Sequence, residues 1–255
     1  MADENRETAA RTALVTGGGR RIGAAIASAL ARAGYAVVLH ANHSRADAER
    51  LAGEIVGAGG RAAVVLADFT QHDAVRGLIP AACAFGPITL LVNNAGIFEP
   101  DELATLERAG FERSFDVNLA APLFLAQAFA AQAPAGSSIV NVLDQRVFRP
   151  TPRFLSYTLS KSALLTATTT LAQALAPRLR VNAVAPGPTL PSPRQSEAEF
   201  AAQAAALPLQ RDPTPEDIAA AVLYLAGATS VTGVTIPVDG GQHLAWRTPD
   251  SDIAE

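Results

Sequence analysis

The sequence predicts an α/β protein, a single Rossmann-type domain with a doubly wound parallel sheet of about seven strands and helices on both faces. Short apolar runs alternate with helical patterns along the chain, which is typical of repeated βαβ units. A glycine-rich turn follows the first apolar run and leads into a helical pattern. Since no composition shift or internal repeat interrupts the 255 residues, we expect one domain over 1–255, with mobile tails at 1–10 and 248–255.

Each strand is expected where a short apolar run is bounded by turn residues. These runs are Thr12–Thr16, Ala36–His40, Arg61–Ala67, Leu90–Asn93, Ser138–Leu143, Arg180–Val184 and Thr235–Val238. Helical periodicity is clearest in Arg20–Ala33, Arg45–Ala58, Phe111–Gln132, Phe154–Ala176 and Pro215–Ala226. The segment Pro186–Ser196 carries four prolines where a loop over the ligand crevice is expected, so we interpret it as a lid.

Composition argues against several classes of function. The formal net charge is −4 and no basic run stands out, which argues against a nucleic-acid partner. The only cysteine, Cys83, can form no internal disulfide, so a reducing cytoplasm is the expected compartment. The polar N-terminus lacks the apolar core of a signal peptide. The longest apolar region, Leu119–Ala133, is interrupted by a proline and two glutamines, so we expect no membrane span, and we expect no metal site.

The turn after the first strand suits a nucleotide cofactor. Gly17 and Gly19 belong to a run of glycines that lets the backbone approach a diphosphate, whose charge the N-terminus of the next helix then stabilises. The spacing is not G-x-G-x-x-G, because Ile22 holds the position of the last glycine. A glycine turn without a ligand is the alternative interpretation.

The end of the second strand indicates which cofactor is bound. NAD would require an acidic residue there for its ribose 2′-hydroxyl, and none occurs before Asp47. Side chains that can donate hydrogen bonds to a 2′-phosphate surround this point instead, namely Arg20, Arg21, His43, Ser44 and Arg45. The pattern therefore favours NADPH. The alternative is a set of solvated residues at the start of the next helix, with Ser44 as its N-cap.

Tyr157 and Lys161 are the candidate acid–base pair. The Y-x-x-x-K spacing places a phenol and an ammonium one helical turn apart on the same face. An ammonium close to a phenol favours the phenolate, so the tyrosine can act as an acid or base nearer neutral pH. A chance pair on a helix surface is the alternative.

With the glycine turn and the run Asn93-Asn94-Ala95-Gly96, this pair resembles the short-chain dehydrogenase/reductase family. The turn is similar to the family pattern T-G-x-x-x-G-x-G, with Arg21 in place of the middle glycine. The resemblance implies that Lys161 also binds the nicotinamide ribose. It implies further cofactor-binding residues at Ile22, His40, Asp68, Asn94, Ala95, Gly96, Pro186 and Gly187.

Three more roles follow from the family resemblance. Asp68 would meet the adenine amino group, and Asn118 would hold a water in a proton relay to Lys161. Thr189 would bind the nicotinamide carboxamide, although Pro191 occupies the family's more usual threonine position. The alternatives are a loop-start aspartate at position 68 and an asparagine that bonds its own helix at position 118.

Asp144, thirteen positions before Tyr157, stands where the family normally has a serine that donates to a substrate carbonyl. An ionised carboxylate only accepts hydrogen bonds and cannot take over that role. A ketone therefore fits only if Asp144 stays protonated through desolvation. A carbon–nitrogen double bond fits better, because its nitrogen must gain a proton and an Asp/Tyr pair can conduct one.

This substitution narrows the resemblance to pteridine reductases and bacterial dihydromonapterin reductases. The pattern T-G-x-x-x-R-x-G and the stretches Leu39–Ser44 and Val238–Leu244 are similar to those enzymes. The resemblance implies that Phe98 sandwiches a pterin against the nicotinamide, with Arg21, Asp144 and Tyr157 also contacting substrate. The chain departs from the pattern at Gly96, where pteridine reductases have a serine, and in the proline-rich loop. An ordinary core or loop aromatic is the alternative for Phe98.

The preferred interpretation is an NADPH-dependent reductase of a pterin-like C=N bond, of dihydropterin, dihydromonapterin or dihydrofolate type, with Tyr157 as proton donor. An NADPH-dependent carbonyl reductase is the first alternative, and a non-catalytic NADPH-binding protein is the second. The family resemblance also implies a homotetramer that pairs the long helices holding Asn118 and Tyr157. We expect Trp246 to pack at a subunit boundary, because an exposed tryptophan is unusual.

Overall fold

Seven parallel strands form one sheet in the order β3-β2-β1-β4-β5-β6-β7, in a computed structural model that describes residues 11–192 and 194–246. The strands are β1 (Thr12–Val15), β2 (Ala36–Ala41), β3 (Ala62–Leu66), β4 (Ile88–Asn93), β5 (Ser138–Val142), β6 (Arg180–Pro186) and β7 (Thr235–Val238). The predicted doubly wound parallel sheet is confirmed. Both predicted tails, 1–10 and 248–255, lie outside the described residues.

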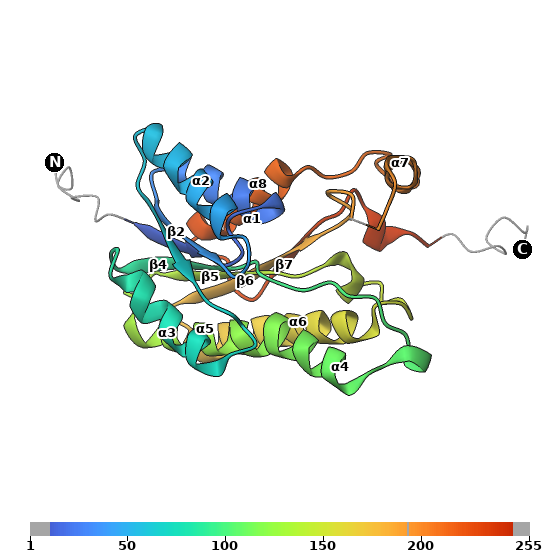
Figure 1. Ribbon diagram of the computed structural model, residues 1–255, viewed down its shortest axis with the longest axis horizontal. Coiled ribbons are helices and arrows are strands. Elements are labelled where there is room, and N and C mark those ends of the chain that lie inside the picture. The colour runs from blue at the N-terminus through green and yellow to red at the C-terminus, as the bar shows by residue number, and fades with distance from the viewer. Residues whose placement is uncertain (1–10, 193, 247–255) are drawn as a thin grey trace, which may run out of the picture.

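Helices cover both faces of the sheet (Figure 1). On one face lie α1 (Arg21–Arg32), α2 (Arg45–Gly57) and α8 (Pro215–Gly227), and on the other lie α3 (His72–Cys83), α4 (Arg108–Phe115), α5 (Ala121–Gln132) and α6 (Leu155–Leu175). A shorter helix, α7 (Glu197–Ala205), follows the proline-rich loop. Single-turn 3₁₀ helices occur at η1 (Leu103–Thr105), η3 (Gln145–Val147) and η4 (Gln242–Leu244), and a π turn at η2 (Asp116–Ala120).

The alternation of side chains along each strand divides the core in two. On β1, Ala13 and Val15 pack among the residues of α1, α2 and α8, while Leu14 packs among those of α3 and α5. Successive strand residues point to opposite faces, and here both faces are buried. The central strands are therefore largely apolar, and most of their side chains are used for packing. Groups for chemistry must come from the strand ends.

The carboxyl ends of β1 and β4 form the topological switch of the sheet. β1 pairs with β2 on one side and with β4 on the other, so the connections leave this point in opposite directions. Ligands bind in the crevice at such a point in doubly wound sheets. The glycine turn follows β1, the run Asn93–Gly96 begins at the end of β4, and Asp144 comes shortly after β5. All three therefore lie at the same edge of the sheet.

The predicted helix Phe111–Gln132 is wrong in one respect, because it is not a continuous α-helix. A π turn, η2 (Asp116–Ala120), joins α4 to α5. One extra residue in a helical turn shifts the face on which the following side chains project, and such bulges are frequent at functional sites. The apolar pattern runs through the insertion unbroken, so the sequence carries no sign of it.

The helical stretch Arg108–Gln132 is long and apolar enough to cross a membrane by length and composition alone. In this fold α5 packs against α3 and β4, and its Leu125 and Phe129 are fully buried in the core. The stretch is a core helix of the α/β fold.

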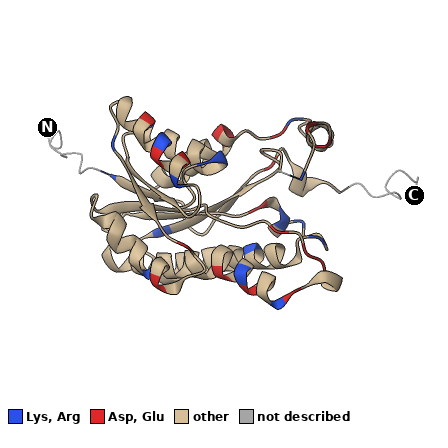
Figure 2. Ribbon diagram, viewed as in Figure 1, with Lys and Arg blue, Asp and Glu red and all other residues tan. Residues whose placement is uncertain are grey.

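Charged residues of both signs are interspersed on the helices, while the strands carry few of them (Figure 2). Several large apolar side chains are exposed on the single chain: Phe124 of α5 at 45 %, Leu159 of α6 at 45 % and Trp246 at 73 %.

The homotetramer and the subunit contact of Trp246 stay predictions. Light scattering at micromolar concentration should give four times the chain mass, and a monomer would contradict it.

Candidate active site

The glycine turn holds the start of α1 against the end of β1. Gly17 has a left-handed backbone (φ 61°), and a Cβ on Gly23 would lie 2.1 Å from the Gly17 carbonyl oxygen. Only glycine fits at position 23 without moving the turn. No side chain caps the first turn of α1, and no acidic residue lies in it. The free N–H groups at this helix end suit an anion such as a diphosphate.

His40 holds the same turn from below. Its Nδ1 accepts the Gly17 N–H at 3.2 Å, its Nε2 lies 3.0 Å from the Ala67 carbonyl oxygen, and its ring stacks on Phe69. Burial lowers the pKa of His40 to about 4, so the ring is neutral and Nε2 carries the proton. Both ring nitrogens are occupied within the protein. His40 therefore supports the glycine turn and also lines the cavity beside it, and its predicted contact with the cofactor stays a prediction.

A cavity of about 710 Å³ opens at this point, lined by the turn, the ends of β2 and β3 and the loop after β4. Asn42, His43 and Ser44 line it, as does Asp68, whose Oδ1 accepts hydrogen bonds from the Thr70 N–H and hydroxyl. Ser44 stands at the N-cap position of α2, but its side chain makes no capping hydrogen bond. The Ser44 hydroxyl is therefore not engaged by the helix. Asn42 is a further lining residue that the sequence reading missed.

Two of the arginines predicted to donate to the 2′-phosphate are paired with acids. Arg20 lies 3.6 Å from Asp47, and Arg45 donates to Glu49 at 2.7 Å. Arg20 lines the cavity, whereas Arg45 does not. Since exposed ion pairs of this kind are weak, Arg20 can still turn to a phosphate. Arg45 is the predicted donor that the fold does not bring to the cavity.

Arg21 lies between this cavity and a second one. Its backbone is left-handed (φ 52°), and its guanidinium donates to the carbonyl oxygens of Leu190 and Pro191 at 3.2 and 3.1 Å. It lines both cavities. The side chain thus holds the proline-rich loop, and its predicted contacts with phosphate and substrate stay predictions. Arg194 also ties the loop predicted as a lid to the Phe98 carbonyl oxygen at 2.9 Å.

The loop after β4 is bonded closely to the first strand. The hydroxyl of Thr16 accepts the N–H groups of Asn94 and Ala95 at 2.9 and 3.0 Å, and the Asn94 amide donates to the Thr16 carbonyl oxygen at 2.8 Å. A Cβ on Gly96 would lie 3.0 Å from Asn118 Oδ1 and 3.5 Å from the Lys161 ammonium. The tight backbone predicted for this run brings Ala95 and Gly96 to the cavity wall.

Asn118 lies on the π turn and is fully buried. Its Oδ1 accepts the Ile97 N–H at 2.9 Å, and its Nδ2 donates to the Ile97 carbonyl oxygen and to the Ser160 hydroxyl. It therefore does not bond its own helix, which removes that alternative. In this structure Asn118 joins the loop after β4 to α6; its role in a water relay stays a prediction.

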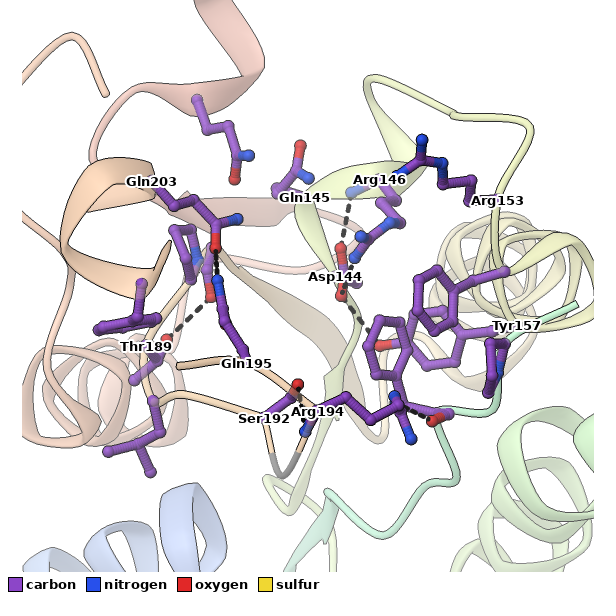
Figure 3. A pocket seen from close by; sticks show the side chains of 18 of the residues that line it. Asp144, Gln145, Arg146, Arg153, Tyr157, Thr189, Ser192, Arg194, Gln195 and Gln203 are labelled. Carbon is purple, nitrogen blue, oxygen red and sulfur yellow. Dashed lines mark hydrogen bonds and ion pairs between the residues drawn. The ribbon is translucent and has the colours of Figure 1, made fainter. Parts of the chain in front are cut away.

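Asp144, Tyr157 and Lys161 converge at the carboxyl end of β5 (Figure 3 for the first two). The Tyr157 hydroxyl donates to Asp144 Oδ2 at 3.0 Å, and the Lys161 ammonium donates to the Val142 carbonyl oxygen at 2.8 Å. Tyr157 is 8 % exposed and Lys161 is 4 % exposed. The sequence spacing of thirteen residues thus becomes a direct hydrogen bond between a carboxyl group and a phenol.

The predicted effect of Lys161 on Tyr157 is wrong for this structure. The ammonium lies 5.9 Å from the Tyr157 ring centre. Burial, and after it the neighbouring Asp144, raise the pKa of the Tyr157 phenol well above its usual value. Burial lowers the pKa of Lys161 to about 8. The carboxylate is the nearer charge, so Tyr157 stays a protonated donor rather than a phenolate.

Asp144 is held by the residue two positions later. The Arg146 N–H donates to Asp144 Oδ1 at 2.9 Å, and the Arg146 guanidinium lies 3.6 Å from Oδ2. Burial raises the pKa of Asp144, and the Arg146 charge opposes that rise. The side chain of Asp144 retains 18 % exposure, so it connects the buried Tyr157 hydroxyl with the cavity.

Phe98 is one half of a stacked aromatic pair. Its ring centre lies 4.0 Å from that of Phe154, with 9° between the planes, and 4.7 Å from that of Tyr157. Phe154 has a left-handed backbone (φ 57°) and stands directly before α6. The guanidinium carbon of Arg146 is almost equidistant from both rings, at 5.1 and 5.3 Å, so it lies beside the pair and not over a face. A substrate can reach only one face of Phe98.

A second cavity, of about 930 Å³, lies in front of this group (Figure 3). Asp144, Tyr157 and Phe98 line it together with Gly187, Thr189 and the following loop. The Thr189 hydroxyl donates to the Gly187 carbonyl oxygen at 3.0 Å. Lining residues that the sequence reading missed include Gln145, Arg146, Phe154, Arg194 and Gln242. A smaller space lined by Ile22, Lys161, Pro186 and Gly187 lies between the two cavities.

The match to known proteins agrees with this arrangement. The family model described as enoyl-(acyl carrier protein) reductase matches residues 18–243. The chain belongs to the short-chain dehydrogenase/reductase family. An uncharacterised oxidoreductase of Methylorubrum extorquens is 39 % identical over 243 residues, which cover 91 % of this chain and 97 % of the relative. The 3β-hydroxysteroid dehydrogenase 1 of Eggerthella lenta is 36 % identical, with 92 % and 94 % covered.

Among solved structures, the short-chain reductase described as FolM alternative dihydrofolate reductase 1 from Brucella canis, complexed with NADP, is similar over its full length. It is 50 % identical, covers 98 % of this chain and 100 % of its own, and superimposes with a TM-score of 0.93. The predicted resemblance to the short-chain family, and to its pteridine-reductase-like branch, is confirmed.

In this short-chain reductase, activity should depend on pH through Lys161. The ammonium is charged below its pKa of about 8 and neutral above it. Since kcat/KM reports the ionisation of the free enzyme, kcat/KM should fall roughly tenfold per pH unit above that value. Rates measured from pH 6 to 10 check this. The Lys161→Arg variant stays charged throughout, so its profile should lose the alkaline decline; an unchanged decline would assign it to another group.

Proposed function

We propose that the chain is an NADPH-dependent reductase of a pterin-like C=N bond, of dihydropterin, dihydromonapterin or dihydrofolate type. The observation that carries the proposal is the 3.0 Å hydrogen bond from the Tyr157 hydroxyl to Asp144 Oδ2, at a position where a carbonyl reductase needs a hydrogen-bond donor. The Brucella canis relative, described as an alternative dihydrofolate reductase, supports the same substrate class.

The chain uses NADP(H), since solved relatives hold NADP or NADPH. The residues present fit this cofactor. The uncapped start of α1 and the close-packed glycines suit the diphosphate. The end of β2 contributes Asn42, His43 and Ser44 to the cavity, and no acid at that strand end would select the 2′-hydroxyl. Lys161 lines the small space between the two cavities, which supports its predicted hydrogen bond to the nicotinamide ribose.

The reaction adds a hydride to carbon and a proton to nitrogen. When bound, NADPH supplies the hydride. Tyr157 is protonated and buried, so it can give its phenolic proton to the substrate nitrogen. Asp144, whose pKa is raised by burial and whose side chain keeps contact with the cavity, takes up a proton from solvent and returns it to Tyr157. Lys161 holds positive charge beside the site while it stays protonated.

The alternative, carbonyl reduction, is favoured by one specific observation. Burial raises the pKa of Asp144, and a protonated carboxyl group can donate a hydrogen bond to a carbonyl oxygen as a serine does. The relatives also include the 3β-hydroxysteroid dehydrogenase and a 3-oxoacyl-(acyl carrier protein) reductase of Synechocystis. The Arg146 charge next to Asp144 favours the ionised carboxylate, which cannot donate to a carbonyl oxygen, and so supports pterin reduction over carbonyl reduction.

Turnover decides between the two substrate classes. Purified protein and NADPH are assayed by the loss of NADPH absorbance with a panel of dihydropterins, dihydrofolate, ketones and aldehydes. For at least one dihydropterin, the expected kcat/KM exceeds the kcat/KM for every carbonyl compound by a factor of about 100 or more. An enzyme inert to all dihydropterins but active on ketones would falsify the pterin assignment.

NADPH should be preferred over NADH by a hundredfold or more. Each charge-assisted hydrogen bond to the 2′-phosphate contributes about 1.5–3 kcal/mol, and about 1.4 kcal/mol corresponds to a factor of ten. Arg20, His43 and Ser44 lie where two such bonds can form. The ratio of kcat/KM for the two cofactors measures the preference. Arg20→Ala should reduce the ratio, while Arg45→Ala, which alters an arginine outside the cavity, should not.

A further inference from the structure

Two glutamines that line the substrate cavity have buried amide oxygen atoms with no hydrogen-bond partner. Gln145 is 6 % exposed, and its Oε1 is buried and unbonded. Gln242 Oε1 is in the same state, as is the Nε of Arg146. All three residues line the 930 Å³ cavity in front of Asp144. A buried polar atom without a partner destabilises the fold, so a group kept in this state in a cavity requires a ligand or water to complete it.

These amides are held in place by rigid neighbours. Gln145 begins the 3₁₀ turn η3 (Gln145–Val147), which Asp144 caps by accepting the Arg146 N–H. Gln242 begins the 3₁₀ turn η4 (Gln242–Leu244), and the buried Asp239 fixes it by accepting the N–H groups of Gly241 and His243 at 2.9 and 2.7 Å. The rings of Phe148 and His243, 5.9 Å apart, join the two turns.

The charged groups of the cavity are already engaged. Arg21 and Arg194 donate to backbone carbonyl oxygens of Leu190, Pro191 and Phe98. The guanidinium of Arg153 lies 4.0 Å from Glu102, and that of Arg146 lies 3.6 Å from Asp144. The unbonded groups of this wall are therefore the two amide oxygens, which accept hydrogen bonds, and the Arg146 Nε, which donates one.

We propose that Gln145 and Gln242 form a specificity subsite that accepts hydrogen bonds from a neutral N–H or O–H group of the substrate. Figure 3 places Gln145 on the opposite side of Asp144 from Tyr157, so the subsite reads a part of the substrate away from the proton donor. The inference rests on the proposed function for the identity of the substrate. On a dihydropterin, such donors come from hydroxyl groups of the side chain or from the ring amino group.

Gln145→Leu and Gln242→Leu remove the amides at similar volume. Three dihydropteridines distinguish the two sources: one with a 6-hydroxymethyl group, one with a 6-methyl group, and the 6-hydroxymethyl compound with an oxo group in place of the 2-amino group. Each variant should lower one kcat/KM ratio about tenfold, either hydroxymethyl over methyl or amino over oxo, because one neutral hydrogen bond is lost. A fall in the first ratio assigns the subsite to the side chain, and a fall in the second assigns it to the ring.

Gln203→Leu is the matched control. Gln203 lines the same cavity, but its Oε1 already accepts from Gln195 Nε2 at 2.9 Å. Its substitution should leave both ratios within about twofold of the wild-type values. An equal fall in the control, or unchanged ratios in both test variants of an enzyme that reduces dihydropterins, would overturn the subsite and leave the proposed function standing.

Thermal unfolding supplies a readout independent of turnover. An unbonded buried amide adds nothing to folding, so the melting temperature of Gln145→Leu should equal or exceed that of the wild type. A fall of several degrees would show that the amide serves the fold, and would overturn the inference. Failure of every dihydropterin as a substrate, with this melting behaviour intact, rejects the proposed function and retains an unbonded amide subsite for a different donor.

Discussion

The kcat of the Tyr157→Phe variant should be lower than that of the wild type by a factor of roughly 10²–10⁴, because general-acid catalysis by a positioned side chain contributes a factor of this size. The substitution removes the hydroxyl that donates to Asp144 at 3.0 Å and leaves the ring in contact with Phe98. NADPH affinity, measured by the change in cofactor fluorescence, should stay within about threefold of the wild-type value, since the phenol oxygen is a small part of the binding surface.

Tyr224→Phe is the matched control for this experiment. Tyr224 lies on α8 with 59 % of its surface exposed, on the opposite face of the sheet from α6. Its kcat should equal that of the wild type. Full activity in Tyr157→Phe would mean that the proton comes from another group, and the hydrogen bond to Asp144 would then have no part in the chemistry.

The Asp144→Ser variant should move selectivity from dihydropterins toward ketones. Loss of the carboxyl group removes the proton connection between Tyr157 and the cavity, so kcat/KM for dihydropterins should fall about a hundredfold or more. The serine hydroxyl can donate to a carbonyl oxygen, so weak ketone activity should be kept or gained. The ratio of the two kcat/KM values gives the selectivity.

Asp144→Asn separates charge from shape in the same position. Asparagine keeps the size of the side chain but carries no exchangeable carboxyl proton, so it should lose dihydropterin activity as serine does. If Asp144 were only a tolerated replacement in a carbonyl reductase, serine would raise ketone activity and the wild type would reduce no dihydropterin at all.

The sequence was enough to place the seven strands, because each is a short, largely apolar run between turn residues, and the strands inside the sheet are buried on both faces. It also brought Asp144, Tyr157 and Lys161 to one strand end, since spacing on a helix and position after a strand are local properties. The π turn at Asp116–Ala120 could not be predicted, because the apolar pattern passes through it without a break.

Contacts between distant segments account for most of what the sequence reading missed. Arg21 donates hydrogen bonds to Leu190 and Pro191, which lie 169 and 170 positions later in the chain. Nothing in the residues next to Arg21 could therefore predict that it holds this loop. The role of His40 depends on which ring nitrogen faces Gly17, which only packing decides. The start of α7 did have a local signal, the capping box of Ser196 and Glu199, which an S-x-x-E search would have found.

The left-handed Phe154 ties two properties of the enzyme together. Its ring backs the face of Phe98, and its backbone sets the direction in which α6 leaves, with Tyr157 three residues later. The next two residues are anchored to Asp101, which accepts the Ser156 N–H, while its carbonyl oxygen accepts the Leu155 N–H. A substitution of Phe154 that makes room for bulkier substrates beside Phe98 would therefore also change the residue that sets the position of Tyr157, the proposed proton donor. Engineering for substrate range would have to start instead from the opposite wall of the cavity, where no side chain belongs to the catalytic helix.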